Sequence, residues 1–416
     1  PAFGMEQWLA PHMGENDAVE EILYHLGSFD QPLVILFSSG TTGKPKCIIH
    51  RAGGLLLQHL KEHALHCDIG ENDRLFYFST CGWMMWNWQI SALALGTTLL
   101  TYDGNPFYPD PSRLIDLIGK EQISVFGTSA KYIDALNKFG VKPKASHDLK
   151  SLKSILSTGS PLLAPSFDFI YDDFKSDLHL ASISGGTDIC ACFVGGVPIL
   201  PVRRGEIQGA MLGLDVMALD ESANPIKGEA GELVCKTAFP SMPLGFWGDE
   251  DGSRYQKAYY SQIDGVWCQG DFLEERVEGG FIIHGRSDTV LNPGGVRIGT
   301  AEIYRQVEAI DEVMEAVAVG QDFEGDQRIV LFVRLAEGVV LDDNLQKTIR
   351  KKIRLGATPR HVPAIIAAVP DIPRTRSGKI SEIAVRDIIH GRKVKNTTAL
   401  ANAECLNFYA DWSLRS

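Results

Sequence analysis

The chain has 416 residues, of which 44% are hydrophobic. At about 150 residues per domain this length predicts two or three globular units, and it excludes a peptide, a fibre and a disordered tail. Lys and Arg number 40 against 52 Asp and Glu, a net charge of −12, which argues against nucleic acid as a partner because phosphate neutralisation needs a basic surface. The eight cysteines show no C-x-x-C pair and no scaffold-like spacing, so we expect free thiols and a reducing, cytoplasmic compartment.

The segment 75–102 carries no charged residue and could be mistaken for a membrane span. Small and polar residues interrupt its apolar run, so we expect a buried strand, a helix and a strand, and no membrane as a partner. The chain begins with Pro1 instead of Met and shows no basic segment followed by an apolar one. It therefore looks truncated at its N-terminus.

The first patterned element is the apolar run Leu33–Phe37, which predicts a buried strand ahead of a turn-rich loop. We expect a helix over Gly53–Cys67. From there to about residue 200, apolar runs such as Ser124–Phe126 and Ser154–Leu156 alternate with helical stretches, which is typical of βα units in a parallel sheet. Between about 205 and 285, Gly, Pro and aromatic residues separate short strands, which predicts antiparallel β structure.

A small basic domain is expected near the C-terminus, because residues 343–395 hold 13 Lys or Arg against 4 Asp or Glu. Its core is expected to come from a helix over Ala301–Val307 and from strands over Ile329–Val333 and Ile365–Val369. The residues after about 395 carry no clear pattern.

The loop Ser38–Lys46 concentrates backbone N–H groups, hydroxyls and two lysines directly after the first predicted strand. A polyphosphate needs such small donors and mobile positive charge. The loop is no Walker A motif, since Ser38 stands where that motif has Gly, and Pro45 follows Lys44. Composition alone fits an ordinary Gly/Ser turn equally well.

Three further segments carry groups suited to a nucleotide, although each also fits a plain turn. Ser184–Asp188 pairs a thin Gly-Gly backbone with a carboxylate that could hold Mg²⁺. Asp271 follows Gly270 in a tight turn, where it could accept two ribose hydroxyls or cap a helix. Thr375–Lys379 places a lysine behind a flexible turn of the basic domain.

In their order along the chain, Ser38–Lys46, Gly270–Asp271, Gly285–Asp288 and Thr375–Lys379 resemble the signature set of the adenylate-forming acyl-CoA synthetase superfamily. The resemblance runs from about residue 30 to 395. Within the superfamily, the segments Gly82–Trp88, Pro240–Trp247 and Leu291–Arg297 are similar to members that use acetoacetate. Family members also carry a long N-terminal portion that has no counterpart in this chain.

This resemblance implies an α/β fold. A large N-terminal domain, 1–287, is expected to combine parallel α/β layers with a distorted antiparallel β-barrel. A small mobile α+β domain, 288–395, and a tail, 396–416, would follow. The implied activity is ATP-dependent activation of acetoacetate as its adenylate, with release of pyrophosphate, and transfer to CoA. ATP, Mg²⁺ and CoA are the implied cofactor, metal and co-substrate.

The resemblance also implies roles for single residues. The β- and γ-phosphates are expected at Thr41, Thr42, Gly43 and Lys44, with Ser39 and Gly40 also binding the nucleotide, and the adenine between Gly159, Ser160, Pro161 and Ser184, Gly185, Gly186. The ribose is assigned to Asp271 and Arg286, the α-phosphate to Arg297, and the metal to Asp188 beside Thr187. Lys379, Arg297 and Thr187 are the expected catalytic residues, and Asp288 is the expected hinge.

The remaining assignments concern the acid and CoA. The acyl pocket is expected at Trp83, Met84, Trp86 and Gly185, where glycine would leave room for a four-carbon keto acid, although most of these aromatic residues also fit a plain core. Gly294 and Gly295 are expected to lie against the pantetheine arm, and Arg350 near the CoA nucleotide, with a solvated helix face as the alternative. No base for the thiol stands out.

Three other interpretations remain open. His59-Leu-Lys-Glu-His63 matches the H-x-x-E-H zinc pattern, with His66 and Cys67 nearby. Such a short match also arises by chance, and in a synthetase this helix is expected to turn its polar face outward. The chain could also be a catalytically incomplete relative, or a ligase for another short-chain acid.

Overall fold

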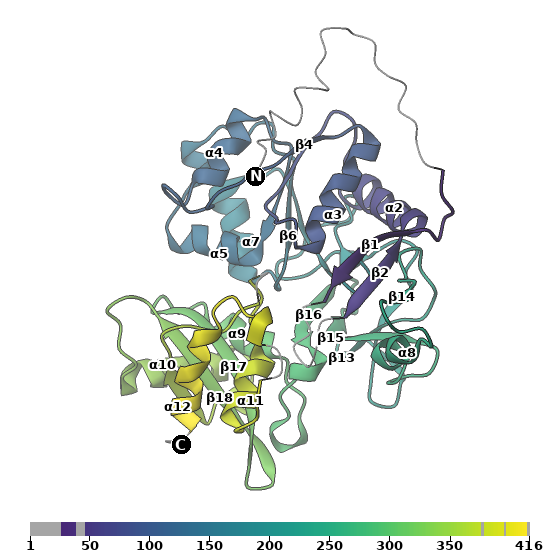
Figure 1. Cartoon of the computed structure of the whole chain (residues 1–416). Coiled ribbons are helices and arrows are strands. Elements are labelled where there is room, and N and C mark those ends of the chain that lie inside the picture. The colour runs from purple at the N-terminus through teal and green to yellow at the C-terminus, as the bar shows by residue number, and fades with distance from the viewer. Residues whose placement is uncertain (1–25, 39–45, 376–377, 395–396, 414–416) are drawn as a thin grey trace, which may run out of the picture.

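The computed structural model describes residues 26–38, 46–375, 378–394 and 397–413; the predicted phosphate loop, 39–44, lies outside them. A five-stranded parallel sheet forms the centre of the N-terminal part (Figure 1). Its order is β4 (Thr98–Leu100), β3 (Arg74–Tyr77), β5 (Val125–Ser129), β6 (Ser154–Thr158) and β7 (His179–Ser182). The helices of this part are α2 (Ala52–Lys61), α3 (Met84–Ile90), α4 (Arg113–Lys120), α5 (Ala130–Lys138), α6 (Pro143–Ser146) and α7 (Ala164–Phe169), with shorter turns η2 (Glu62–His66), η3 (Ser91–Leu95) and η4 (Ile170–Phe174).

Side chains on the two faces of this sheet enter two different cores. Phe126 and Ile155 pack against α4 and α5, whereas Val125 and Leu156 join the core that contains Trp88 of α3. The alternation follows from the two-residue period of a strand, and burial on both faces is the usual state of a parallel sheet. The predicted βα units and the predicted strand, helix and strand over 75–102 are confirmed.

The run Leu33–Phe37 forms a strand, β1 (Pro32–Phe37), but the expectation that it is buried is wrong. It lies at the edge of an antiparallel sheet with β2 (Cys47–Arg51) and β14 (Gly245–Phe246). Leu33, Ile35 and Phe37 are exposed, whereas Val34 and Leu36 pack on the core. An unbroken apolar run does not reveal whether one face of a strand or both are covered.

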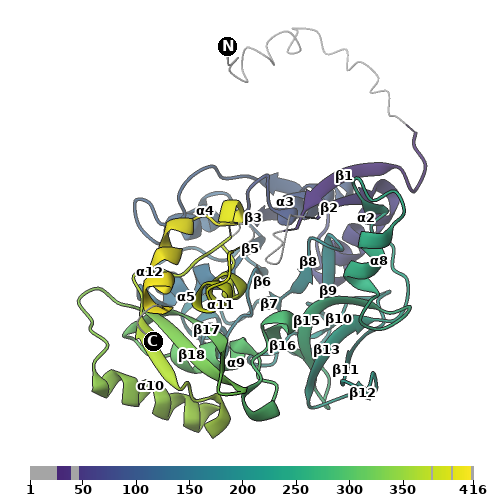
Figure 2. The ribbon, with the colours of Figure 1, turned by 60° about the horizontal axis from the view of Figure 1, so that its bottom comes forward.

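Two more antiparallel sheets follow the parallel sheet, and the second lies within 205–285 as predicted, whereas β8 and β9 fall before residue 200, where parallel βα units were expected. One has the order β10 (Gly209–Ala210), β9 (Ala191–Gly195), β8 (Ser184–Gly186). The other has the order β12 (Pro225–Ile226), β11 (Val216–Leu219), β13 (Ala230–Cys235), β15 (Trp267–Glu275), β16 (Phe281–Arg286). The helix α8 (Ser253–Tyr259) lies between β14 and β15 in sequence, and Figure 2 shows it beside these sheets.

The C-terminal part has a sheet of its own, in the order β17 (Val313–Phe323), β18 (Asp326–Leu335), β19 (Ile365–Ala368). Its helices are α9 (Thr300–Val307), α10 (Asp343–Gly356), α11 (Glu382–Ile389) and α12 (Leu406–Ser413), with turns η5 (Ser287–Thr289), η6 (Pro293–Gly295), η7 (Pro359–His361), η8 (Thr397–Ala399) and η9 (Ala403–Cys405). α9 and α10 share one core with the sheet, and α11 and α12 share the other. The predicted helix and both predicted strands are present, and the predicted fold class is confirmed: a mixed α/β fold with parallel and antiparallel sheets and a smaller C-terminal domain.

Residues 397–413, set apart as a tail on sequence grounds, pack on this smaller sheet. Tyr409 is fully buried, and its ring and that of Trp412 meet Phe332 edge-on, with centroids 4.9 and 5.0 Å away. The predicted domain boundary at residue 287 coincides with the start of η5 and stays a prediction. Within the described part of the chain, no helix is both long and apolar enough to cross a membrane.

Candidate nucleotide and acyl site

Two of the predicted adenine-contacting segments lie side by side at one edge of the parallel sheet. Gly159 directly follows β6 and Ser184 follows the neighbouring β7. The hydroxyl of Thr158 donates to the carbonyl oxygen of Ile183 at 2.8 Å and joins the two strand ends. Ligands of open α/β sheets bind at this carboxyl edge. The geometry therefore brings together residues that the sequence separates by about 25 positions.

The predicted acyl-pocket residues differ in their surroundings. A Cβ on Gly159, which has φ +92°, would lie 3.9 Å from Cζ2 of the half-buried Trp83, so that indole flanks the adenine segment. Trp86 is half-buried and Met84 is buried. Gly185 pairs with Cys192 in the β8–β9 hairpin, and a Cβ there would lie 2.0 Å from the Ala191 carbonyl oxygen. Close packing of the hairpin thus requires glycine at position 185. A role of Gly185 in acid selection stays a prediction.

Asp188, the predicted metal ligand, lies at the turn between β8 and β9. Its Oδ1 accepts hydrogen bonds from Lys46 Nζ at 2.5 Å and from the Tyr259 hydroxyl at 2.7 Å. Burial raises the pKa of this carboxyl, but Lys46 and Tyr259 outweigh it, so the pKa lies below its ordinary value. Asp188 is therefore an anion at neutral pH. His50, buried under the same turn, has its pKa lowered to about 4 by desolvation and is neutral there.

The predicted ribose residues lie on the β15–β16 pair. Asp271 is the register partner of Arg286, and the carboxylate and guanidinium are 3.4 Å apart. Gly270 has φ +85°, and a Cβ there would lie 2.7 Å from the Arg286 side chain. Glycine is needed at this position because other residues rarely adopt that conformation and because Arg286 leaves no room. Gln269 donates to Asp271 at 2.9 Å and fixes the carboxylate.

A cavity of about 370 Å³ opens beside these residues. Its lining includes Tyr259, Gly270, Arg286, Asp288 and Arg297. Arg297, expected at the α-phosphate, lies over the ring of Phe272 with its guanidinium carbon 4.9 Å from the centroid. Two arginines and one aromatic wall suit an anionic, flat ligand.

Lys379 comes from the C-terminal part, yet charged residues of the N-terminal part shift the pKa of its ammonium group. Desolvation lowers its pKa from the ordinary value, and Arg286 acts in the same direction, whereas Asp271 and Asp188 raise it. The residue as a whole stays exposed, so water moderates this lowering. The pKa of Lys379 therefore responds to the charges of Asp271, Arg286 and Asp188.

The expected CoA residues make contacts within the C-terminal part, whereas the expected hinge, Asp288, also has its carboxylate 3.5 Å from Arg286. Arg386 of α11 donates to the Asp288 carbonyl oxygen at 2.9 Å. The Gly294 N–H donates to the Asp326 carboxylate, 3.1 Å from each oxygen, and Gly295 ends the same turn, η6. Arg350 donates to Gln346 of its own helix and to Ala364. These distances do not test whether Gly294, Gly295 or Arg350 contacts CoA, so those assignments stay predictions.

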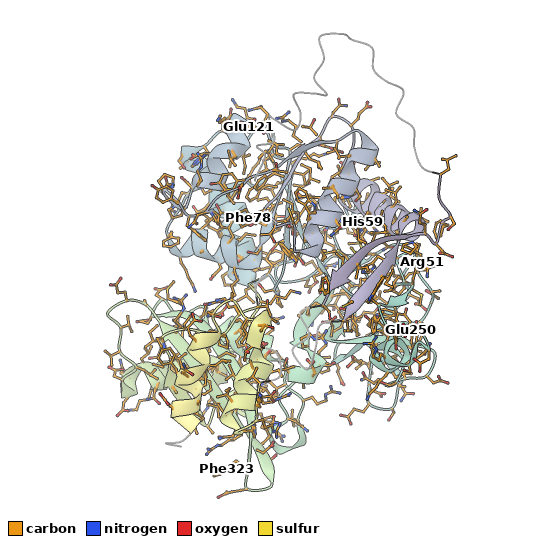
Figure 3. All side chains as sticks on the ribbon, in the orientation of Figure 1. Arg51, His59, Phe78, Glu121, Glu250 and Phe323 are labelled. Carbon is orange, nitrogen blue, oxygen red and sulfur yellow. The ribbon has the colours of Figure 1, made fainter. Side chains whose placement is uncertain are left out.

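The H-x-x-E-H segment is a buried structural network, and the expectation of an outward polar face is wrong. His59, Glu62 and His63 are at most 1% exposed, and Figure 3 labels His59 inside the N-terminal part. His59 Nε2 lies 2.6 Å from the Cys190 carbonyl oxygen and His63 Nε2 lies 2.8 Å from that of Trp88. Across the residues that the structure describes, no group of three His, Cys, Asp or Glu side chains forms a metal site.

Sequence reasoning missed the groups that support the predicted residues. Tyr259 and Gln269 hold Asp188 and Asp271, and Arg386 holds Asp288. Tyr259 stands 71 residues after its partner, in a helix without a motif. Only the Gly270–Asp271 segment, which follows this helix and was singled out in the sequence, could have directed attention to it.

The donor set fits Mg²⁺ bound together with a nucleotide. Among the described residues no hydrogen bond reaches Asp188 Oδ2, while Oδ1 carries two. Mg²⁺ commonly uses one or two carboxylates plus substrate phosphates and keeps several waters, so a cage of three protein ligands is not required. Asp188, with Thr187 beside it, would hold such an ion.

Comparison with known proteins agrees with this geometry. The AMP-binding enzyme profile matches residues 9–247, and the profile of the AMP-binding enzyme C-terminal domain matches residues 302–379. The chain belongs to the AMP-binding enzyme family. This family assignment covers both parts of the fold that contribute to the site.

Three relatives of this AMP-binding enzyme are informative. The chain is 62% identical over 382 residues to the acetoacetyl-coenzyme A synthetase of Rhizobium meliloti (strain 1021), covering 92% of this chain and 59% of that protein. It is 49% identical to the acetoacetyl-CoA synthetase of Mus musculus, covering 92% and 57%. The solved acetoacetyl-CoA synthetase from Streptomyces lividans superposes with a TM-score of 0.90 at 42% identity, covering 96% and 62%. The chain thus spans about three fifths of the length of these relatives.

Proposed function

We propose that this chain carries the catalytic site of an ATP-dependent acid–thiol ligase. The reaction joins acetoacetate to ATP as acetoacetyl-AMP, releases pyrophosphate, and transfers the acyl group to CoA. The observation that carries the proposal is the cavity of about 370 Å³ whose lining includes Gly270, Arg286, Asp288 and Arg297, beside the Asp271–Arg286 pair. The identity with acetoacetyl-CoA synthetases supports acetoacetate as the acid.

In the first half-reaction an acetoacetate oxygen attacks the α-phosphorus of ATP. The new O–P bond forms as the bond to the β-phosphate oxygen breaks, and pyrophosphate leaves with that electron pair. Negative charge grows on the phosphate oxygens, where Lys379 and Arg297 would stabilise it. Asp271 and Arg286 would hold the ribose. Mg²⁺ beside Asp188 would neutralise charge on the leaving pyrophosphate.

In the second half-reaction the CoA sulfur attacks the carbonyl carbon of the adenylate. A C–S bond forms, the C–O bond to AMP breaks, and the thiol proton passes to solvent. The thiol and Lys379 need the same small volume at different times. We therefore propose that the C-terminal part turns about Asp288 between the steps and brings residues 292–296 to the site.

The reaction is proposed to run in the cytoplasm. The structure describes all eight cysteines as free thiols, which suits a reducing compartment. Acetoacetate, ATP and CoA are the proposed partners, all of them small molecules.

Pyrophosphate release with a panel of acids tests the proposal. With ATP and CoA present, acetoacetate is expected to give the fastest release, followed by butyrate and then acetate, and thioester is expected to accumulate with acetoacetate. A faster rate with another short-chain acid would identify that acid as the substrate instead of acetoacetate. Absence of acid-dependent release from folded protein would instead assign the chain to a catalytically incomplete relative.

A further inference from the structure

Asp188 is held by a residue that no motif contains. Tyr259 ends α8, is 1% exposed, and places its hydroxyl 2.7 Å from Asp188 Oδ1. Lys46 Nζ reaches the same oxygen at 2.5 Å and lies 4.8 Å from the centroid of the Tyr259 ring. One carboxylate oxygen therefore carries both donors.

The direction of the Tyr259 hydroxyl is fixed by its ring. The ring stacks on Trp267 with centroids 3.9 Å apart and an interplanar angle of 14°. Tyr255 and Phe246 meet it edge-on, at 5.1 and 5.7 Å. A ring enclosed on three sides keeps its hydroxyl in one place, since neither χ angle can change without displacing a neighbour.

We propose that Tyr259 is a positioning residue: by occupying Asp188 Oδ1 together with Lys46, it leaves Oδ2 oriented for the divalent cation that accompanies the ATP phosphates. The inference rests on the proposed function. In this proposal the Tyr259 hydroxyl acts on the cation through Asp188, whereas the Tyr259 ring lines the cavity.

The protonation states agree with this role. Desolvation and the neighbouring Asp188 both raise the pKa of Tyr259, so its hydroxyl keeps its proton and donates. The pKa of Asp188 is lowered because Lys46 and Tyr259 outweigh desolvation, so the carboxylate is available as an anion. Loss of the tyrosine hydroxyl would leave Lys46 as the sole described donor to Oδ1 and would let the carboxylate rotate.

The test compares Tyr259→Phe with Tyr255→Phe. Both variants remove one hydroxyl from the same helix and aromatic cluster, but the structure gives Tyr255 no contact with Asp188. Binding of Mn²⁺ in the presence of ATP is measured by electron paramagnetic resonance without turnover. The Mg²⁺ dependence of acetoacetate-stimulated pyrophosphate exchange is measured in parallel.

We expect Tyr259→Phe to weaken Mn²⁺ binding and to raise the half-saturating Mg²⁺ concentration about tenfold, as for loss of a hydrogen bond to a charged group. The exchange rate at saturating Mg²⁺ should stay within a few-fold of the original, and Tyr255→Phe should leave both constants unchanged. Equal behaviour of the two variants would overturn the inference. A loss of rate that excess Mg²⁺ fails to restore would overturn it as well.

The Mn²⁺ measurement separates this inference from the proposed function, because it needs no acid and no turnover. If the wild-type chain binds Mn²⁺ with ATP but catalyses no exchange, the function fails while Tyr259→Phe still tests the inference. Should Tyr259→Phe fail to fold, Trp267→Phe keeps the hydroxyl and loosens the stack. It must then shift Mn²⁺ affinity in the same direction by a smaller factor, and an unchanged affinity would overturn the inference.

Discussion

At Gly185 the backbone itself fills the space that a side chain would need. A Cβ would lie 2.0 Å from the Ala191 carbonyl oxygen and 2.6 Å from Cys192 Cα. Backbone atoms of a paired strand cannot move aside without breaking the hairpin that carries Asp188. A large residue at position 185 would therefore disrupt the turn that carries Asp188 as well as any acyl pocket.

We predict that Gly185→Ala destabilises the fold by about 3 kcal/mol, the upper range for overpacking. Gly186→Ala is the matched control, because its Cβ would lie 3.1 Å from the side-chain amide nitrogen of Gln269 and at an ordinary 3.7 Å from Asp188 N and Oδ2. Thermal unfolding measures both. Equal melting temperatures for the two variants would contradict the packing role of Gly185.

Lys379→Ala should separate the two half-reactions. Removal of a charge that acts in the first transition state is expected to slow adenylate formation by roughly two to three orders of magnitude. Thioester formation from preformed acetoacetyl-adenylate and CoA should remain, because Lys379 has no proposed role there. Rapid quench with each starting material measures the two rates. Equal losses in a folded variant would contradict the alternation of the two steps.

At the residue scale, motif spacing predicted which side chains approach one another but not what orients them. Asp271 and Arg286 belong to recognisable segments, and they are register partners. Tyr259 belongs to no segment with a chemical signature, and its contact with Asp188 depends on where α8 packs. Orientation is a tertiary property, so a single sequence does not contain it in readable form.

At the element scale, α2 and its continuation η2 also show which features the sequence predicted and which it did not. The helix over Gly53–Cys67 was predicted from its pattern, but its polar face was placed on the wrong side. His63 and His66 direct ring nitrogens to carbonyl oxygens of Trp88 and Gly196, and Glu62 accepts from Trp88 Nε1 at 2.9 Å. A polar residue satisfied by distant backbone looks like a surface residue in the sequence.

Neutral buried histidines should make this element acid-sensitive. Desolvation lowers the pKa of His63 to about 3 from 6.5, so the folded chain leaves it unprotonated where the unfolded chain binds a proton. The stability is therefore complete above pH 6.5 and is lost as the pH falls from 6.5 toward 3. Thermal unfolding across that window is expected to show a fall of several degrees.

His63→Gln should flatten this slope, because the titrating group is gone while a side-chain donor to the Trp88 carbonyl remains. His147→Gln is the control, since that ring contacts Asp116 and Ser146 at the surface. A slope that is the same in wild type and His63→Gln would contradict the assignment.

The two parts of the molecule meet through an ion cluster that lies beside the site and outside its motifs. Lys131 of α5 lies 3.1 Å from Glu308 and 3.2 Å from Glu315 of the C-terminal part. Arg374 pairs with Glu315 through two hydrogen bonds. Arg374 and Lys131 outweigh burial and lower the pKa of Glu315 to about 2, so Glu315 stays charged at neutral pH, whereas burial raises the pKa of Glu308.

This arrangement of the parts was not predictable from the sequence. The fold class and most core elements follow from periodicity, because each strand and helix shows its buried face locally. The pair Lys131–Glu308 joins residues 177 positions apart, and a single charged residue on a helix is usually just solvated. These charged residues pair because the C-terminal part packs against the N-terminal part, as Figure 1 shows.

Lys131→Ala should bias the molecule against the arrangement in which Lys379 faces the nucleotide site. The contact between Lys131 and the two glutamates joins the parts only while they are docked in this way, so a turn about Asp288 would break it. Its loss is expected to slow pyrophosphate exchange about fivefold, equivalent to about 1 kcal/mol for a partly exposed ion pair. Thioester formation from preformed adenylate should be unchanged or faster.

Lys142→Ala removes an exposed pair with Asp173 inside the N-terminal part and should alter neither rate. A parallel loss of both half-reactions in Lys131→Ala, or an equal effect of Lys142→Ala, would contradict a role of the cluster in domain docking.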